Sequence, residues 1–331
     1  MTRVYRSEDH GQSWRRLGDV PEMFWAGLFT HRGAVYLLGT EKRFGRIVIR
    51  RSTDGGRTWT EPTDGATGLL TARGEYHAAP MPMIVHRGRL WRAIEDAGHG
   101  KRWPTRFRAM IISAPVESDL LQRESWTFSN ALASDPDWLD GQFDGWLEGN
   151  AVVAPDGGVV NLLRVEAGRA GSFAAIVEAS EDGKTIAFDP EQGLFSFPGG
   201  ATKFTVRWDP VSQHYWSLVN WVPPKHDDGR PHLRIRNTLA LARSKDLRDW
   251  ELRTIVLYHP DVEKHGFQYV DWLIEGDDLI AVSRTAYDDG LGGAHTHHDS
   301  NFMTFHRLKD FRTQSMADAA TDFKALQRLA R

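Results

Sequence analysis

Two histidines about twenty residues apart have the spacing of a proton-transferring pair. His77 lies in the segment EYHAAP, at the start of a predicted strand, and His99 follows the strand expected to pair with it. A hairpin brings the start of one strand and the end of the next to the same edge of a sheet. Imidazole titrates near neutral pH and therefore suits acid–base catalysis. The alternative is that the two histidines are unrelated residues of surface loops.

A second pair of side chains offers a charge for recognition. Glu148 precedes one predicted strand, and Arg164 ends the next strand along the chain. The two residues can therefore lie at one end of a sheet. An arginine facing an aqueous channel suits carboxylate recognition, because its planar fork donates to both oxygens. The alternative is that Glu148 and Arg164 simply pair with each other.

Three further cations stand beside predicted strands: Lys203, Arg207 and Arg236. If they converge with Arg164 on one channel, the ligand is expected to be anionic although the whole chain is slightly acidic.

The loop AHTHHD, residues 294–299, contains imidazole and carboxylate groups of the kind that bind zinc. Its three histidines crowd one short loop, which disfavours their binding a single ion. We therefore expect no metal there, and expect His298 and Asp299 to face a channel mouth as polar groups.

A repeated turn pattern indicates the elements that position these residues. The pattern S-x-D-x-G-x-[ST]-W occurs at residues 7–14 and 52–59, and degenerate copies begin at Ser180 and Ser244. Asp and Gly suit a tight turn, and the Trp is expected to be a buried anchor between sheets. The two full copies start 45 residues apart, the length of one four-stranded propeller blade.

Strand-like segments dominate the rest of the chain. They are rich in β-branched and aromatic residues and are bounded by Gly and Asp turn signals; examples are 33–40, 46–50, 81–86, 89–94, 158–165, 215–219 and 278–284. Short polar turns join strands in pairs, as in HRGAVYLLGT and HRGRLWRAIED, and we expect each pair to be the first two strands of a blade. With 331 residues, the repeat length predicts about seven blades, an all-β seven-bladed propeller. We expect residues 301–306 to join the N-terminal strand in the closing blade, which would remove open sheet edges.

Only the C-terminal segment has the pattern of a helix. Residues 316–329 contain strong helix formers and place Ala319, Phe323 and Leu326 on one face. The sequence therefore predicts one propeller domain over residues 1–312 and a helical tail over residues 313–331.

Composition excludes several classes of function. The formal net charge is −3, so the chain lacks the basic field that nucleic-acid binding needs. It has no cysteine, hence no disulfide or thiolate site, and no apolar run long enough to span a membrane. The first residues run directly into the first repeat without an apolar leader, which predicts a cytoplasmic protein. A secreted protein whose leader had been removed would look the same.

The repeated turn resembles the Asp-box, or BNR repeat, of sialidase-like β-propellers. Several longer stretches resemble a narrower group, the seven-bladed propellers that act on uronate-containing glycans. They are EYHAAPMPMIVHRGRLWRAIED, GWLEGNAVVAPDGGVVNLLRV, GGATKFTVRWDPVSQHYWSLVN, RNTLALARSKDLRDWELR, and YVDWLIEGDDLIAVSRTAYDD with HHDSNFMTFHRLKDFR. That group includes ulvan lyases, L-rhamnose-α-1,4-D-glucuronate lyases and α-L-rhamnosidases. The resemblance runs over most of residues 20–312.

The resemblance implies roles for individual residues. His77 matches the first of two lyase histidines, His99 is the nearest match to the second, and Arg164 matches the arginine that neutralises the uronate carboxylate. Sixteen residues before Arg164, where these lyases have a tyrosine, this chain has Glu148. The implied reaction is β-elimination on an anionic glycan, without a cofactor. Some relatives carry a structural calcium ion.

Two other functions remain open. One is glycoside hydrolysis of the rhamnosidase or sialidase type, although the Arg-Ile-Pro or Arg-Leu-Pro segment of sialidases is absent. The other is glycan binding without catalysis, which the replacement of the lyase tyrosine by Glu148 favours. In each case the predicted binding residues are Glu148 with Lys203, Arg207, Arg236 and His298.

Overall fold

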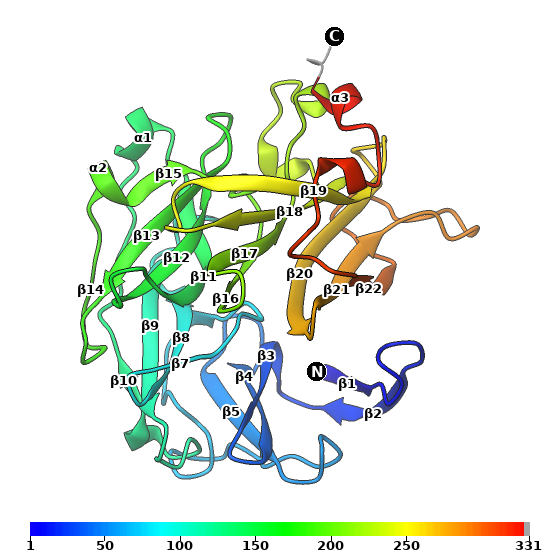
Figure 1. The fold of residues 1–331 in the computed structure, drawn as a ribbon. Helices are drawn as coiled ribbons and strands as arrows, with labels where there is room; N and C mark the ends of the chain where they lie inside the picture. Colours follow the sequence, from blue (N-terminus) through cyan, green and yellow to red (C-terminus); the bar gives the residue numbers. More distant parts are fainter. Residues whose placement is uncertain (328–331) are drawn as a thin grey trace.

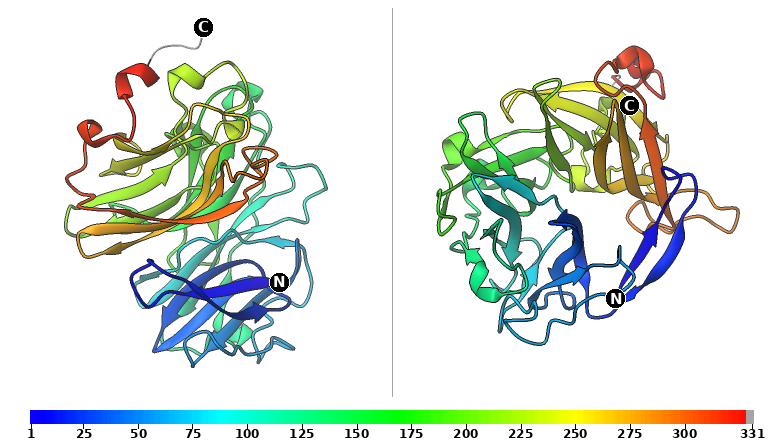
Figure 2. Two further views of the ribbon diagram at one scale, coloured as in Figure 1. Left: turned by 90° about the vertical axis from the view of Figure 1, so that its right-hand side faces the viewer. Right: turned by 60° about the horizontal axis from the view of Figure 1, so that its bottom comes forward.

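Five antiparallel sheets surround a central axis as the blades of a β-propeller (Figures 1 and 2). This computed structural model describes residues 1–327. The all-β propeller is confirmed, but the predicted number of seven blades is wrong. The 45-residue spacing does not measure one blade, because the first repeated turn lies in a separate N-terminal hairpin. Blades also run longer than the repeat, since the fourth extends from residue 205 to residue 258.

The first blade contains β3 (Phe24–His31), β4 (Ala34–Thr40) and β5 (Ile47–Ser52). The second contains β6 (Tyr76–His77), β7 (Ile84–His86), β8 (Arg89–Asp96), β9 (Arg108–Pro115) and β10 (Thr127–Phe128). The third contains β11 (Gly145–Val153), β12 (Val159–Glu166), β13 (Phe173–Ala179), β14 (Ile186–Ala187) and β15 (Leu194–Ser196). The fourth contains β16 (Thr205–Asp209), β17 (His214–Val219), β18 (Thr238–Ser244) and β19 (Trp250–Tyr258). The fifth contains β20 (Gly266–Glu275), β21 (Asp278–Ala286) and β22 (Phe302–Leu308).

Short hairpins join the first strands of the blades, as the sequence predicts. The loops at Arg32-Gly33 and Arg87-Gly88 have two residues each, and φ is positive at all four positions (47°, 77°, 46° and 72°). Two-residue turns of this kind match the right-handed twist of the strands that they connect. The chain therefore returns immediately, and the first two strands of a blade form a rigid ladder next to the axis.

The hydrophobic core lies between neighbouring blades. Four tryptophans are almost completely buried at these contacts: Trp91, Trp146, Trp216 and Trp272. Trp91 packs with the third blade, and Trp216 packs with Trp272 of the fifth blade. Each blade is thus held by the apolar faces of its neighbours, which positions the inner strands relative to one another.

The N-terminal hairpin consists of β1 (Thr2–Arg6) and β2 (Arg15–Val20). Val4 and Val20 pack with Leu37 and Val48 of the first blade. On its other side, the hairpin meets β22 through side chains, and the rings of Trp14 and Phe305 lie 5.7 Å apart. The expected neighbourhood of the N-terminus and residues 301–306 is therefore found. Within residues 1–327, however, β22 is paired with β21 only and β1 with β2 only.

The repeated pattern forms one hydrogen-bonded turn at each copy. In the second copy, Ser52 Oγ donates to Asp54 (2.8 Å), and the amide of Gly56 donates to Ser52 Oγ (2.8 Å). The indole of Trp59 donates to the carbonyl of Gly56 (3.1 Å), and Trp14 makes the same bond to Gly11 in the first copy. The prediction of a buried tryptophan is wrong for Trp14, which is 47% exposed because it lies in the turn between β1 and β2, outside the contacts between blades.

Helices are few and short. They are η1 (Arg123–Ser125), α1 (Trp138–Gly141), α2 (Pro190–Gly193), η2 (Pro224–His226), η3 (His232–Arg234), η4 (Met316–Asp318) and α3 (Phe323–Leu326). The predicted helix over 316–329 is thus a 3-10 turn followed by a single α-helical turn, and residues 328–331 lie outside the described part. Met316, Phe323 and Leu326 pack with the fourth blade. Across residues 1–327, no helix combines the length and hydropathy that crossing a bilayer requires.

Candidate functional site

Three innermost strands carry a one-residue bulge at the same end of the axis. Each of these strands has one more residue than its partner strand at the bulge. The extra residue lies between Phe24 and Gly27 in β3, between Leu147 and Asn150 in β11, and between Gln268 and Asp271 in β20. Each bulge contains a residue with positive φ: Trp25 (48°), Glu148 (57°) and Tyr269 (52°). Such bulges redirect a side chain out of the alternating pattern of the strand. Three blades thus turn an aromatic or acidic side chain toward a shared region.

Glu148 is buried and held by Arg164. The guanidinium donates to Glu148 Oε2 (2.6 Å) and, with its other terminal nitrogen, to Glu166 Oε1 (2.6 Å). Burial, the largest single influence, would raise the pKa of Glu148, but the charge and hydrogen bond of Arg164 together with the nearby charges of His77 and Arg236 lower that pKa below its usual value. The same carboxylates raise the pKa of Arg164 against the effect of burial. The alternative that Glu148 and Arg164 pair with each other is confirmed, and this fixes Glu148 as an ionised carboxylate.

Backbone packing also fixes the position of Glu148. The next residue is Gly149, and a Cβ atom at this position would overlap the side chain of Asn161 on the neighbouring strand. The bulge therefore needs glycine after Glu148 because the two strands approach too closely for a side chain.

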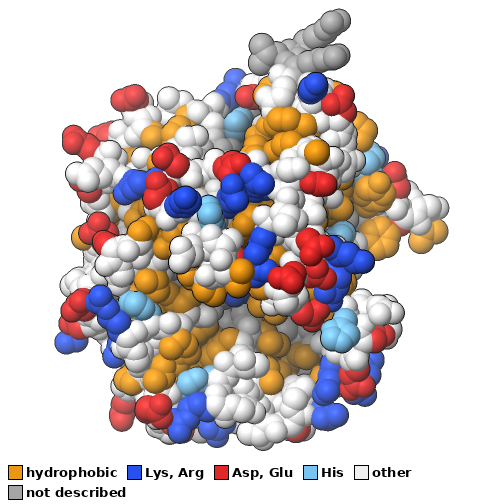
Figure 3. Space-filling view, in the orientation of Figure 1, with side chains coloured by type: hydrophobic (Ala, Val, Ile, Leu, Met, Phe, Trp, Pro, Cys, Tyr) orange, Lys and Arg blue, Asp and Glu red, His pale blue; other side chains and the backbone are white. Residues whose placement is uncertain are grey.

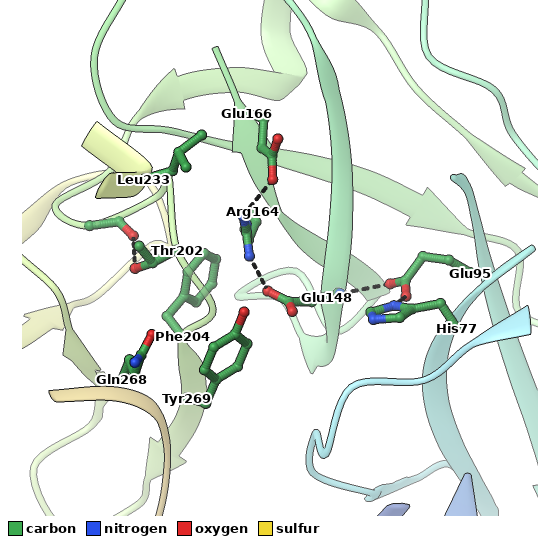
Figure 4. A network of polar contacts seen from close by, with 12 residues as sticks. His77, Glu95, Glu148, Arg164, Glu166, Thr202, Phe204, Leu233, Gln268 and Tyr269 are labelled. Carbon is green, nitrogen blue, oxygen red and sulfur yellow. Dashed lines mark hydrogen bonds and ion pairs between the residues drawn. The ribbon is translucent and has the colours of Figure 1, made fainter. Parts of the chain in front are cut away.

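His77 forms a buried dyad with Glu95. Nδ1 of His77 lies 2.6 Å from Glu95 Oε2, and the other oxygen of Glu95 accepts the amide of Gly149 (3.0 Å). A carboxylate oxygen accepts hydrogen bonds, so Nδ1 is the nitrogen that donates to Glu95 and Nε2 is the nitrogen left for another partner. Figure 4 shows the imidazole beside Glu95 at the right-hand side of the network, with Glu148 nearer its centre. Glu95 was not among the residues predicted for the site, although the register pairs it directly with His77.

Aromatic rings surround His77. The ring centroid of Trp25 lies 4.4 Å from that of His77, and the centroid of Phe107 lies 5.1 Å away. Trp103 stands at the edge of this group, 6.3 Å from His77 and 44% exposed, and its indole donates to Glu166 (3.2 Å). Of these rings only Trp103 is exposed, and an exposed indole face is suited to stacking on a sugar ring.

His99 lies at the predicted end of the second blade but not at the dyad. It is exposed in the loop that follows β8. The nearest polar partner of His77 is Glu95, and the rings packed against His77 are those of Trp25, Trp103 and Phe107. The structure therefore gives His77 a carboxylate partner from the paired strand.

Tyr269 brings a phenol to the same centre. In Figure 4 its hydroxyl points toward the Glu148–Arg164 pair. The hydroxyl lies 3.2 Å from His298 Nε2, and the guanidinium groups of Arg236 and Arg284 lie 5.3 and 4.8 Å from its ring centroid. Tyr269 was not among the residues predicted for the site, because its direction depends on a bulge in β20 that the alternation of polar and apolar residues does not reveal.

Two predicted binding residues flank this tyrosine. Arg236 is buried and donates to Gln268 Oε1 (2.6 Å). Burial and the nearby charges of Arg236 and Arg284 lower the pKa of His298 to about 4, so this imidazole is neutral near pH 7. His298 thus faces the site as a neutral hydrogen-bonding group.

Lys203 and Arg207 lie at different depths. Lys203 is buried, its ammonium donates to Thr205 Oγ1 and to the carbonyl of Val270 (both 2.7 Å), and burial lowers its pKa to about 8. Arg207 lies further along β16, where it donates to Asp271 (3.2 Å) and to the carbonyl of Trp272 (2.6 Å). The structure therefore brings Lys203 toward the charged centre and turns Arg207 toward the opposite end of the inner strands.

The opposite end of the axis has a different character. A cavity of about 720 Å³ there is lined mainly by apolar side chains, including Ile84, Val153, Tyr215 and Leu273. Figure 3 shows hydrophobic side chains gathered in the hollowed middle of the face that it displays. The titratable groups of the dyad are not among the residues that line this cavity.

One cluster could hold a metal ion within residues 1–327. Ligand atoms of His259, His265 and Asp288 lie within 4.8 Å of one another. His265 Nδ1 is 3.0 Å from Asp261 Oδ2, a carboxylate that would orient the imidazole from behind. The loop 294–299 contributes no ligand to this cluster.

Comparisons with known proteins support the fold. The sequence matches no protein-family model, and no curated protein matches it. The α-L-arabinanase of Penicillium chrysogenum, solved with arabinobiose, is 15% identical with a TM-score of 0.55, covering 93% of this chain and 85% of its own. The endo-arabinase of Bacteroides thetaiotaomicron VPI-5482 is 11% identical with a TM-score of 0.51, covering 87% and 94%. The Hadza microbial sialidase Hz136 is 16% identical with a TM-score of 0.56, covering 93% and 59%.

At such low sequence identities, the structural similarity shows a shared fold and nothing more specific. The chain is a β-propeller of the kind found in arabinanases and in a sialidase, as the resemblance to sialidase-like propellers implies.

Proposed function

We propose that this protein is a carbohydrate-active enzyme that acts on glycans containing acidic sugars. The observation that carries the proposal is the 2.6 Å contact between His77 and Glu95, at the end of the axis where three inner strands bulge. A histidine oriented by a carboxylate is a general base with its free nitrogen fixed in direction. Arg236 forms no ion pair with a carboxylate within residues 1–327, so its charge favours a substrate that carries negative charge.

The proposed reaction is β-elimination at a uronate. Nε2 of His77 removes the proton on C5, which is acidic because C5 lies next to the carboxylate. The electron pair forms the C4–C5 double bond as the C4–O bond breaks, and the hydroxyl of Tyr269 donates its proton to the departing oxygen. The charge that develops on the carboxylate is stabilised by Arg236, since Arg164 already donates to two glutamates. The proton on His77 then returns to Tyr269 through solvent.

The state of the glutamates favours elimination over hydrolysis by two carboxyl groups. Such hydrolysis needs one carboxyl group that stays protonated to act as an acid. Glu148 and Glu166 both accept from Arg164, and Glu95 accepts from His77 and Gly149. All three are therefore occupied as hydrogen-bond acceptors, and the phenol is the group placed to donate a proton.

A second candidate is hydrolysis with Tyr269 as the nucleophile. The specific observation in its favour is that the phenol points toward the Glu148 carboxylate and is flanked by Arg236 and Arg284 (Figure 4). Sialidases use a tyrosine nucleophile in place of a carboxylate. Both reactions use Tyr269 and Arg236, so the products must decide between them.

The test is product analysis on uronate-containing oligosaccharides, with rhamnosyl-glucuronate linkages first. Elimination gives an unsaturated uronide, detected by its ultraviolet absorbance, and the His77→Ala variant should lose this signal. Release of reducing sugar with no absorbance would favour hydrolysis. Saturable binding with neither product would show a glycan-binding protein and would refute the enzymatic proposal.

A further inference from the structure

A positively charged cavity lies next to the dyad, on the first two blades. Its volume is about 740 Å³. Six cations line it, together with two carboxylates: Lys42, Arg43, Arg46, Arg73, Lys101 and Arg106, with Glu41 and Glu75. A surplus of positive charge in one cavity stands out in a chain whose net charge is −3.

Loops from three places build the cavity at the end of the axis where the dyad lies. The turn 41–46 follows β4, the segment 72–75 leads into β6, and residues 101–106 follow β8. The amide of Tyr76 donates to the carbonyl of Gly45 (3.1 Å), and the amide of Ala97 donates to that of Glu75 (2.7 Å). The third segment is joined through Arg106, which donates to Glu75 (2.5 Å) and to the carbonyl of Ala97 (2.9 Å), so the cations are carried on a connected frame.

The two carboxylates of the cavity are already neutralised. Glu41 pairs with Arg46 (2.6 Å), and Glu75 pairs with Arg106 (2.5 Å). The other four cations, Lys42, Arg43, Arg73 and Lys101, are exposed and form no ion pair within residues 1–327. Their charge is therefore available to a ligand, and the ligand that this charge selects is an anion.

Aromatic contacts connect the cavity to the dyad. Arg106 is only 9% exposed and lies 3.9 Å from the ring centroid of Phe44, a residue of the cavity wall. Phe44 lies 5.2 Å from Trp25, and Trp25 lies 4.4 Å from His77. The aromatic rings of Trp25 and Phe44 therefore lie between the dyad and the cations of the cavity.

We propose that this cavity is a subsite for a second acidic group of the same glycan chain. The inference rests on the proposed function and extends it, because it makes the substrate a polyanion with a carboxylate or sulfate ester beyond the reacting sugar. The subsite binds and aligns the chain and takes no part in proton transfer. Its contribution should weaken as salt rises, since the four free cations are exposed.

The experiment compares binding by two variants that each remove four positive charges. The cavity variant combines Lys42→Gln, Arg43→Gln, Arg73→Gln and Lys101→Gln; the control combines Lys225→Gln, Lys245→Gln, Lys309→Gln and Lys324→Gln, all exposed elsewhere. Both are made in the His77→Ala background, so that binding is measured without turnover. Tryptophan fluorescence reports the Kd of a uronate tetrasaccharide, a sulfated tetrasaccharide without uronate, and a neutral one.

The cavity variant should bind an acidic tetrasaccharide roughly tenfold or more weakly at low salt, with little change for the neutral sugar. Whichever acidic probe shows this loss identifies the anion as carboxylate or sulfate. Unchanged Kd values, or an equal loss in the control variant, would overturn the subsite. Because the assay measures no turnover, the subsite can stand if wild-type protein proves inactive. If the wild-type protein turns over the glycan but the cavity variant binds it with an unchanged Kd, the subsite proposal is refuted and the proposed function is not.

Discussion

Glu95 accepts hydrogen bonds from two different blades, from His77 of its own blade at 2.6 Å and from the Gly149 amide of the third blade at 3.0 Å. The second contact lies directly after Glu148, so one carboxylate couples the imidazole to the bulge that carries the other acid. The orientation of His77 and the position of Glu148 therefore depend on the same residue.

Glu95→Gln should lower kcat by roughly a hundredfold or more, because an amide no longer fixes the proton on Nδ1. The amide oxygen of the new side chain can still accept from Gly149, so the melting temperature should change little. The measurements are kcat and KM on the active oligosaccharide together with thermal unfolding. Glu178→Gln, an exposed change on the third blade, serves as the control. Full activity in the Glu95 variant would remove the dyad from the mechanism.

Tyr269→Phe should abolish most turnover while the Kd of the oligosaccharide stays near its wild-type value. The change removes one oxygen and keeps the ring against which Arg236 and Arg284 pack. Both candidate reactions need the hydroxyl, one as acid and the other as nucleophile. Steady-state kinetics and equilibrium binding separate the two effects. A variant that retains its kcat would show that the phenol does not take part.

Arg164→Met should destabilise the protein by about 3–5 kcal/mol, because two buried carboxylates lose their common partner. Glu148→Gln should cost less, since Glu166 still pairs with Arg164. Urea unfolding at pH 7 gives both values. The prediction is contradicted if the arginine variant is as stable as the glutamine variant.

The Glu148 pair should also appear in the pH dependence of stability. The pKa of Glu148 is lower in the folded protein than in the unfolded chain. The ionised Glu148 therefore contributes its full stabilisation of the folded state above the ordinary glutamate pKa of about 4.3, and this contribution is lost as pH falls below that value. Glu148→Gln should therefore show a shallower decline in unfolding free energy on acidification than wild type. Parallel curves for the two proteins would argue against the shifted pKa.

Two tryptophans allow a comparison of how much the contacts between blades and the N-terminal hairpin contribute to the free energy of unfolding. Trp216→Ala should cost about 3–5 kcal/mol, because this side chain is fully buried between the fourth and fifth blades. Trp14→Ala should cost clearly less, since its ring is 47% exposed and contacts mainly Phe305. Chemical unfolding of both variants checks the order. An equal or larger loss at Trp14 would mean that the hairpin holds the ring together more strongly than its burial indicates.

Sequence patterns predicted the parts of the fold that depend on local turns. The Arg32-Gly33 and Arg87-Gly88 hairpins and the repeated serine–aspartate turns form as expected, because each is determined by a few adjacent residues. The number of blades depends on how long the connections between strands are, and the repeat spacing does not contain that information.

The site was predicted in part for a similar reason. His77, Glu148 and Arg164 stand beside regular strands, and their convergence follows from the hairpin ladders. Glu95 was within reach of the same reasoning, since it is the residue opposite His77. Tyr269 was not, because its direction comes from an extra residue in β20 that only the three-dimensional register reveals.

Trp25, Glu148 and Tyr269 hold a left-handed backbone conformation that is unfavourable for residues with a side chain, by on the order of 1–3 kcal/mol each. Glycine at any of them would relax the chain and at the same time remove a side chain that the bulge turns toward the proposed site. Folding and chemistry therefore make opposite demands on these three positions. A relative of this protein that has the same propeller fold but no need of these three side chains would gain stability from inner strands without the bulges.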